Sequence, residues 1–226
     1  MPGTPPLGPA ALPRVLFQTR LARRLFLLSV LVVAIAAATA FGASPARARV
    51  PAACASASEP LGSASPAVVE AAVACLVNAE RAAARLGPVQ TAAALEVSAQ
   101  RHASDMIART FFAHVSPSGG TVDKRARRAG YITGPCWALG EDLGWAPPTV
   151  ASAQAVVGAW MESPRHRSVI LDADFRDIGI GLVMRAPTDD GSGATFVLEL
   201  GAVGPCGAGG AGGTVRATPR ARIRVS

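Results

Sequence analysis

The chain has 226 residues, half of them hydrophobic, which suffices for one ordinary domain with a sizeable core plus extensions. Its formal net charge is +7, but the excess lies at the two ends: residues 1–48 carry five arginines and no acid, and the last eleven residues carry four more arginines. Residues 49–215 are near neutral and show no basic face interleaved with aromatic residues. The composition therefore argues against a nucleic-acid partner.

The first 48 residues are typical of an export signal. A basic flank precedes an uncharged run of 19 residues, Leu25–Ala43, and A-x-A cleavage patterns end at Ala40 and Ala48. We interpret residues 1–48 as a signal peptide that is cleaved. The alternative is an uncleaved membrane anchor formed by the same run, 25–43, which is close to the shortest length that spans a bilayer. Both interpretations place the domain outside the cytoplasm, either secreted or membrane-anchored.

Four cysteines in a chain expected to be exported predict two disulfide bonds. The sequence has no C-x-x-C pair, so a structural zinc site or a thioredoxin-type motif is not favoured. Of the three connectivities, we expect Cys54–Cys75, which would tie the mature N-terminus to the first helix. We also expect Cys136–Cys206, which would close a loop of about 70 residues.

The first half of the predicted domain, 65–203, is helical. The preceding stretch, 49–64, is small and polar and is predicted to be a linker. Ser65-Pro66 combines an N-cap residue with proline at the first helical position, which predicts a helix that ends at Gly87-Pro88. A second helix is expected over about 92–109.

A loop at 115–120 and a short charged helix between Thr121 and Gly130 come next. Residues 132–148 contain two Pro-bearing pairs and are predicted to be irregular. The clearest helix follows, because apolar residues recur at i, i+3, i+4, i+7 and i+8. These residues are Ala153, Val156, Val157, Trp160 and Met161.

Ser163-Pro164 repeats the helix-start pattern and predicts a short helix through Leu171. Residues 177–185 and 194–202 read as two strands joined by a hairpin loop. From 204 to 226 the chain is Gly-rich and then basic, and this tail is predicted to be disordered. Helices first and strands last indicate an α+β fold.

Three polar residues are candidates for a common site. His114 begins a loop, and His166 lies in the first turn of a helix, where the dipole favours a neutral ring that can bind a metal or accept a proton. Glu141 lies between glycines in an apolar stretch, so we expect it to be partly buried and to need a partner. Two histidines and one glutamate form a catalytic-type zinc ligand set, and equally a metal-free hydrogen-bonded cluster.

Two further residues could belong to this set. His102, inside the second predicted helix, is interpreted as a half-buried packing residue bonded to Asp105 or Ser98. Glu162 precedes His166 by four residues and is a tentative fourth member of the site, although a solvated helix face is an equally good interpretation.

Seven segments occur in the order and spacing of one known family. They are LVNAERAAARLGPV, ALEVSAQRHASDM, FFAHVSPSGGT, RARRAGY, GEDLGW, WMESPRHRSVIL and FRDIGIG. The chain thereby resembles the CAP superfamily (cysteine-rich secretory proteins, antigen 5 and pathogenesis-related proteins), in particular its bacterial SCP-like branch. The resemblance covers about 70–202. It implies an α-β-α sandwich with a small antiparallel sheet between helical layers, and a central cleft lined by a His/Glu tetrad.

Matched to the family motifs, His114, Glu141 and His166 are the implied cleft residues. Some family members bind a divalent metal through the two histidines, so the resemblance implies a zinc or other divalent metal site at His114 and His166. In an enzyme of this kind, Glu141 would act as the base.

The chain departs from the family pattern at three positions. Asp142 replaces an asparagine and adds a carboxylate to the site. Arg165 replaces a glycine beside His166. Ser163 stands where eukaryotic members have the second glutamate of the tetrad, so Glu162 is a tentative substitute.

These observations leave three functional hypotheses. The first is a secreted, monomeric, non-catalytic CAP domain that binds an extracellular lipid, sterol, peptide or cell-wall fragment. The second is a metal-dependent hydrolase, such as a peptidase or cell-wall lytic enzyme, that uses the same cleft. The third is a structural or adhesive surface protein. A membrane is an expected partner only if the N-terminal segment stays uncleaved.

Overall fold

The computed structural model describes residues 54–205, 213–217 and 221–222. The predicted signal peptide or anchor, residues 1–48, lies outside these ranges. Within the described ranges, no helix is long and apolar enough to cross a membrane.

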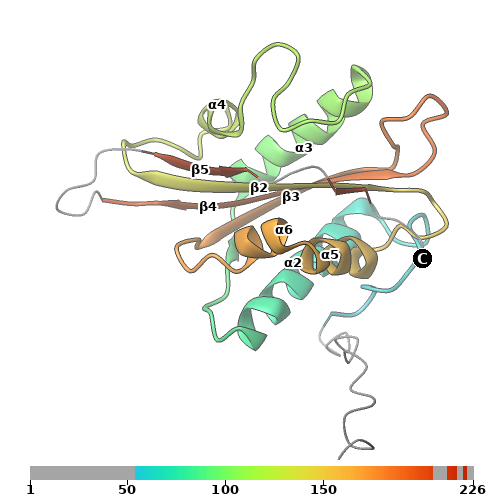
Figure 1. Ribbon diagram of the computed structural model, residues 1–226, viewed down its shortest axis with the longest axis horizontal. Helices are drawn as coiled ribbons and strands as arrows, with labels where there is room; N and C mark the ends of the chain where they lie inside the picture. Colours follow the sequence, from blue (N-terminus) through green and yellow to red (C-terminus); the bar gives the residue numbers. More distant parts are fainter. Residues whose placement is uncertain (1–53, 206–212, 218–220, 223–226) are drawn as a thin grey trace, which may run out of the picture. The chain divides into compact units, whose positions relative to one another are not determined.

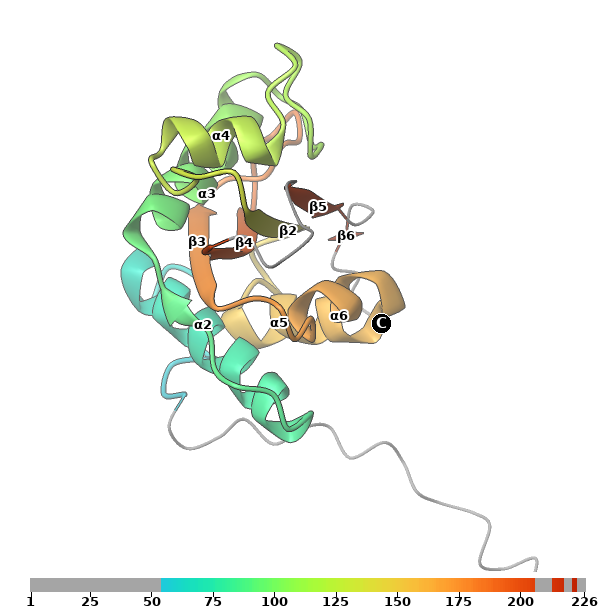
Figure 2. The same ribbon diagram turned by 90° about the vertical axis from the view of Figure 1, so that its left-hand side faces the viewer.

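One sheet lies between two layers of helices, as Figure 1 shows with the sheet nearly edge-on. On one face lie α3 (Ala93–Ala108) and α4 (Val122–Arg128). The other face is covered by α2 (Pro66–Ala83), α5 (Ala153–Glu162) and α6 (Pro164–Ile170). The view turned by 90° shows the same separation, with α4 and α6 on opposite sides of the strands (Figure 2). The predicted α+β sandwich is confirmed.

The centre of the sheet is antiparallel and its edges are parallel. Its strand order is β1-β3-β4-β2-β5, with β6 also paired to β2. The strands are β1 (Gln90–Thr91), β2 (Trp137–Ala146), β3 (Asp177–Val183), β4 (Ala194–Val203), β5 (Thr214–Ala217) and β6 (Ala221–Arg222). The β3–β4 and β2–β4 pairs are antiparallel, whereas β1, β5 and β6 pair in parallel. The sheet is therefore mixed, and larger than the small antiparallel sheet expected.

Strand β2 corrects the prediction that residues 132–148 are irregular. A strand covered on both faces does not alternate between apolar and polar residues, so periodicity does not reveal it. Gly140 and Gly144 are required by close packing: a Cβ atom at Gly140 would approach the Val169 side chain to 2.7 Å, and one at Gly144 would approach Val156 to 2.8 Å. These glycines read as loop residues in the sequence because their packing partners are distant along the chain.

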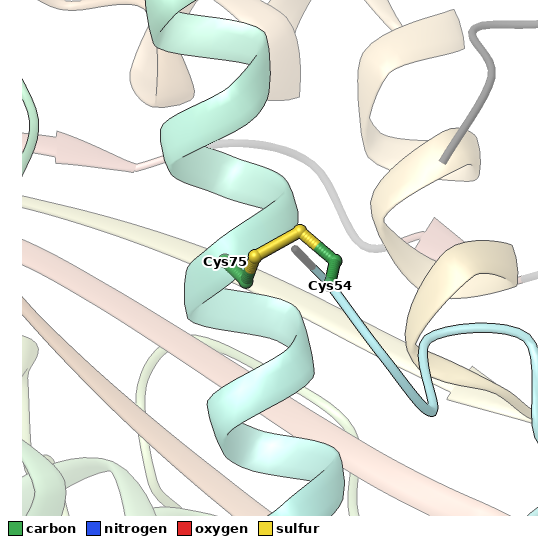
Figure 3. The surroundings of a disulfide bond; sticks show 2 residues. All are labelled: Cys54 and Cys75. Carbon is green, nitrogen blue, oxygen red and sulfur yellow. A yellow bond between two sulfur atoms is a disulfide. The ribbon is translucent and has the colours of Figure 1, made fainter. Parts of the chain in front are cut away.

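The predicted linker, 49–64, is also corrected over its described part. Cys54 and Ala57 are buried in the main core, and Leu61 packs against it. The predicted Cys54–Cys75 disulfide is present and fastens this segment to α2 (Figure 3). Cys136 is disulfide-bonded too, but its predicted partner, Cys206, lies outside the described residues, so that pairing stays a prediction.

The C-terminal tail, 204–226, is not disordered throughout. Residues 214–217 form β5, which pairs with residues 138–141 of β2, and residues 221–222 form β6. The physical reason is the free edge of β2, whose unpaired backbone groups accept another strand whatever its composition. The Gly-rich residues 206–212 lie outside the described ranges.

Candidate functional site

The alternation of β2 decides which side chains can meet. Leu139 and Leu143 pack against residues of the α3 and α4 layer. Glu141 lies between them on the same face, whereas the intervening Gly140 and Asp142 face α5 and α6. The Glu141 side chain is fully buried, so its carboxylate needs compensation from this layer alone.

Three residues from different segments surround the Glu141 carboxylate. His114 Nδ1 lies 2.6 Å from Oε1, and Arg125 of α4 donates from Nη2 to Oε2. His102 Nε2, on α3, is 4.0 Å from Oε2. The structure thus brings Glu141 and His114 into contact. Sequence reasoning missed Arg125, and nothing in the run of arginines at 125–128 distinguishes the one that turns inward.

A second buried carboxyl group, Glu199 of β4, lies directly opposite Glu141 in the sheet. Ser98 Oγ donates to Glu199 Oε1 at 3.0 Å, and Arg125 Nε is 3.9 Å from the same oxygen. Sequence reasoning missed Glu199 as well. The available signal was a single charged residue within the apolar strand FVLELG.

The two carboxyl groups hold different protonation states. Burial and, to a lesser degree, the negative charge of Glu141 raise the pKa of Glu199 to about 8 against the opposing effect of Arg125. Burial also raises the pKa of Glu141, but the His114 hydrogen bond and the charge of Arg125 outweigh it, so the net pKa is below its usual value. Near neutral pH, Glu141 is ionised and Glu199 keeps its proton.

His102 is neutral in this environment. Burial lowers its pKa to about 4, despite the nearby Glu141 carboxylate. Its Nε2 lies 3.0 Å from the Ala113 carbonyl oxygen, which can only accept, so Nε2 carries the proton. The prediction of a half-buried packing residue bonded to Asp105 or Ser98 is therefore wrong: the side chain is fully buried and binds the loop.

The same residues fasten the loop that follows α3. Arg125 Nη1 donates to the carbonyl oxygens of His114 and Gly120, each at 3.0 Å. The loop closes on itself through a bond from Ser116 N to Gly120 O at 3.0 Å. Together with the His102–Ala113 bond, these contacts hold residues 113–120 at both ends. The buried cluster thus acts as a scaffold for this loop.

His166 lies on an element of the other helical layer. It is buried on α6, which covers the opposite face of the sheet from α3 and α4 (Figure 1). Asp142 is buried and faces that second layer, and Glu162, at the end of α5, is exposed. That these residues share one site with Glu141 therefore stays a prediction, and the place of α5 and α6 in the other layer does not support it.

The described residues give the predicted metal site no support. His166 lies on α6 in one helical layer, whereas His114 contacts Glu141 on the side of α3 and α4. No group of three His, Cys, Asp or Glu side chains within the described part of the chain is arranged to hold a metal ion. The metal site at His114 and His166 is therefore not supported and stays a prediction.

An open cleft of about 280 Å³ lies between α3, the loop after His114 and α4. Ser98, His102 and Arg125, all buried, line it together with the exposed side chains of Arg101, Arg109 and Arg128. The Glu141 cluster lies beside the cleft and shares His102 and Arg125 with it. The cleft lining is therefore rich in arginine and serine rather than in His and Glu.

The three-layer fold and this cluster define a domain class that comparison with known proteins identifies. The model of the cysteine-rich secretory protein family (CAP) matches residues 75–199, more than half of the chain. The chain belongs to this family.

Among curated proteins, the uncharacterised protein YkwD of Bacillus subtilis (strain 168) is 36% identical over 110 residues, which cover 48% of this chain and 40% of YkwD. The chain thus matches less than half of that relative's length.

Two solved structures align with the chain at 21% identity. An outer surface protein from Borrelia burgdorferi aligns with a TM-score of 0.47 over 57% of this chain and 88% of its own. An extracellular SCP-domain protein from Bacillus anthracis str. Ames aligns with a TM-score of 0.48 over 61% and 43%.

Proposed function

We propose that this protein is an extracellular ligand-binding CAP domain whose ligand occupies the cleft between α3, α4 and the loop at 113–120. The observation that carries the proposal is the cleft itself, which is open, polar and built on an ion-pair cluster around the buried Glu141. An extracellular location is supported by the Cys54–Cys75 disulfide, since such bonds persist in oxidising compartments. The ligand classes in question remain a lipid, sterol, peptide or cell-wall fragment.

In this proposal the Glu141 carboxylate helps to position the binding loop and does not itself touch the ligand. Both carboxylate oxygens of Glu141 already accept hydrogen bonds, one from His114 and one from Arg125. A general base must reach the proton that it removes, and a fully buried carboxylate of this kind does not. The hydrolase hypothesis therefore receives no support from this geometry.

The test is a retention assay with a cleft-filling variant. The secreted full chain is incubated with isolated bacterial cell walls and, separately, with phosphatidylcholine vesicles with and without cholesterol. Ser118→Trp places a bulky ring at the exposed rim of the cleft, whereas Ser168→Trp places the same ring on α6, on the other face of the sheet.

We expect the parent chain and Ser168→Trp to be retained on at least one probe and Ser118→Trp to be lost. Equal retention of the two variants would place the ligand elsewhere. An absence of retention on every probe would contradict the ligand-binding proposal.

A further inference from the structure

The lining of the cleft has an unbalanced charge. It contains four arginines but one carboxylate, Asp105. Asp105 forms an ion pair with Arg109, whose Nε donates to Oδ1 at 2.6 Å and whose Nη2 donates to Oδ2. Arg125 forms an ion pair with Glu141 in the buried cluster. The two other arginines of the lining, Arg101 and Arg128, have no compensating negative charge in the lining.

Arg101 and Arg128 approach the cleft from two different elements. Arg101 is exposed on α3 and Arg128 is exposed on α4. Neither forms an ion pair with any side chain in the part of the chain that the structure describes. Arg128 is also held in place, because its Nε donates to the Lys124 carbonyl oxygen at 3.2 Å and its Nη2 lies close to Gly120 in the loop.

A neutral donor lies beside these two guanidinium groups. Ser118, in the fastened loop, lines the same cleft, whereas the buried Ser116 side chain is hydrogen-bonded to Asp105. A carboxylate is planar, and one guanidinium group can bind both of its oxygens, as Arg109 binds Asp105 in this cleft. A phosphate group presents oxygens on all sides and matches guanidinium and hydroxyl donors that come from several directions.

We propose that the cleft binds its ligand through a phosphate group held by Arg101 and Arg128, with Ser118 as a further donor. This inference rests on the proposed ligand-binding function and names the chemical class of the ligand, a phosphate ester. The ester is the headgroup of an anionic lipid or a soluble or polymeric phosphate ester, and the experiment separates these sources.

The experiment is a calorimetric titration of the secreted full chain with glycerol 3-phosphate, inorganic phosphate and acetate. Arg101→Gln/Arg128→Gln removes the two uncompensated charges. Arg165→Gln/Arg167→Gln, on exposed positions of α6, is the control because it changes the net charge equally on the opposite face. Thermal unfolding verifies that both double variants fold, as expected for exposed side chains.

We expect saturable binding of glycerol 3-phosphate that is about tenfold or more weaker in the cleft variant and unchanged in the control. Acetate should bind about tenfold or more weakly than the phosphate compounds. Equal binding of acetate, an equal loss in both double variants, or no saturable binding of either phosphate compound would overturn the inference.

Vesicles of phosphatidylcholine with and without phosphatidylglycerol identify the source. Retention only with phosphatidylglycerol, lost in the cleft variant, indicates a lipid headgroup. Glycerol 3-phosphate binding without vesicle retention indicates a soluble or polymeric ester. If cell walls or neutral vesicles retain Arg101→Gln/Arg128→Gln but not Ser118→Trp, the ligand-binding proposal stands and the phosphate inference fails.

Discussion

At the scale of single residues, the buried cluster balances one cation, Arg125, against one ionised carboxylate, Glu141. The neighbouring Glu199 avoids a second negative charge by keeping its proton. Taking charges out of water is expensive, and the cost is offset only where each charge keeps its partner. The cluster should therefore respond strongly to the loss of any one member.

Replacement of Arg125 by methionine should strongly destabilise the fold. The change leaves the Glu141 carboxylate buried without its cation, which costs about 3–5 kcal/mol in comparable cases. Arg127→Met is the matched control, since Arg127 is exposed on the same helix and loses only a contact 5.4 Å from the Trp137 ring, worth about 1 kcal/mol or less. Urea unfolding measures both, and similar costs for the two variants would contradict the role of Arg125.

Glu199 should make stability depend on pH above neutrality. Its pKa is raised to about 8 from an ordinary 4.5, so between these values the folded chain binds more protons than the unfolded chain. The free energy of unfolding therefore falls as pH rises through this window, by at most about 1.4 kcal/mol per pH unit. His102, lowered to about 4 from 6.5, acts in the opposite direction but only below about pH 6.5.

Unfolding measured between pH 6.5 and 8 consequently isolates Glu199. The parent chain should lose stability over this interval, and Glu199→Gln, which cannot ionise, should remove that loss. If the parent and the variant show the same slope, Glu199 does not hold its proton in the folded state.

At the scale of elements, α3 supplies several residues of the cleft lining. The position of this helix depends on two glycines of β3. A Cβ atom at Gly179 would come within 2.2 Å of the Leu95 backbone, and one at Gly181 within 2.4 Å of the Ala99 backbone. Helix α3 can approach β3 this closely only because glycine has no Cβ atom. The close packing of α3 on β3 therefore sets the distance of His102 and Arg101 from the sheet.

Gly181→Ala should push α3 away from the sheet and destabilise the fold by about 1–3 kcal/mol or more, because backbone cannot yield as a flexible side chain does. Gly158→Ala is the control: Gly158 is exposed within α5 and has no neighbouring atom within 4 Å of the added carbon. That change should stabilise by about 0.5–1 kcal/mol through helix propensity. Melting temperatures that move in the same direction in both variants would rule out the close approach as the cause.

The helices and the β3–β4 hairpin were predictable because their signals are local. The Ser-Pro starts of α2 and α6 and the apolar periodicity of α5 are read within a few residues. Strands β2 and β5 were not predictable, because each owes its form to partners far along the chain. The same reason hid Glu199, which meets Glu141 only through the pairing of β2 with β4.

At the scale of the whole molecule, export is the prediction with the broadest consequence. The exported chain should appear in the culture medium with an intact mass that begins at Phe41 or Arg49, after cleavage at Ala40 or Ala48. Mass spectrometry of the medium and of the membrane fraction measures this directly. Full-length chain found in the membrane fraction alone would establish the anchor in place of the cleaved signal.

The sequence by itself determined the family, the order of the helices and the hairpin, because motifs and periodicity are properties of neighbouring residues. It favoured the Cys54–Cys75 bond among three connectivities, and the structure contains that bond. It also indicated that Glu141 is buried with His114. Only the tertiary structure decided that His166 lies on the other face of the sheet and that Arg125 and Glu199 lie beside Glu141. The reason is that β2 sends alternate side chains to opposite layers, and the packing of the helices decides which layer each partner joins.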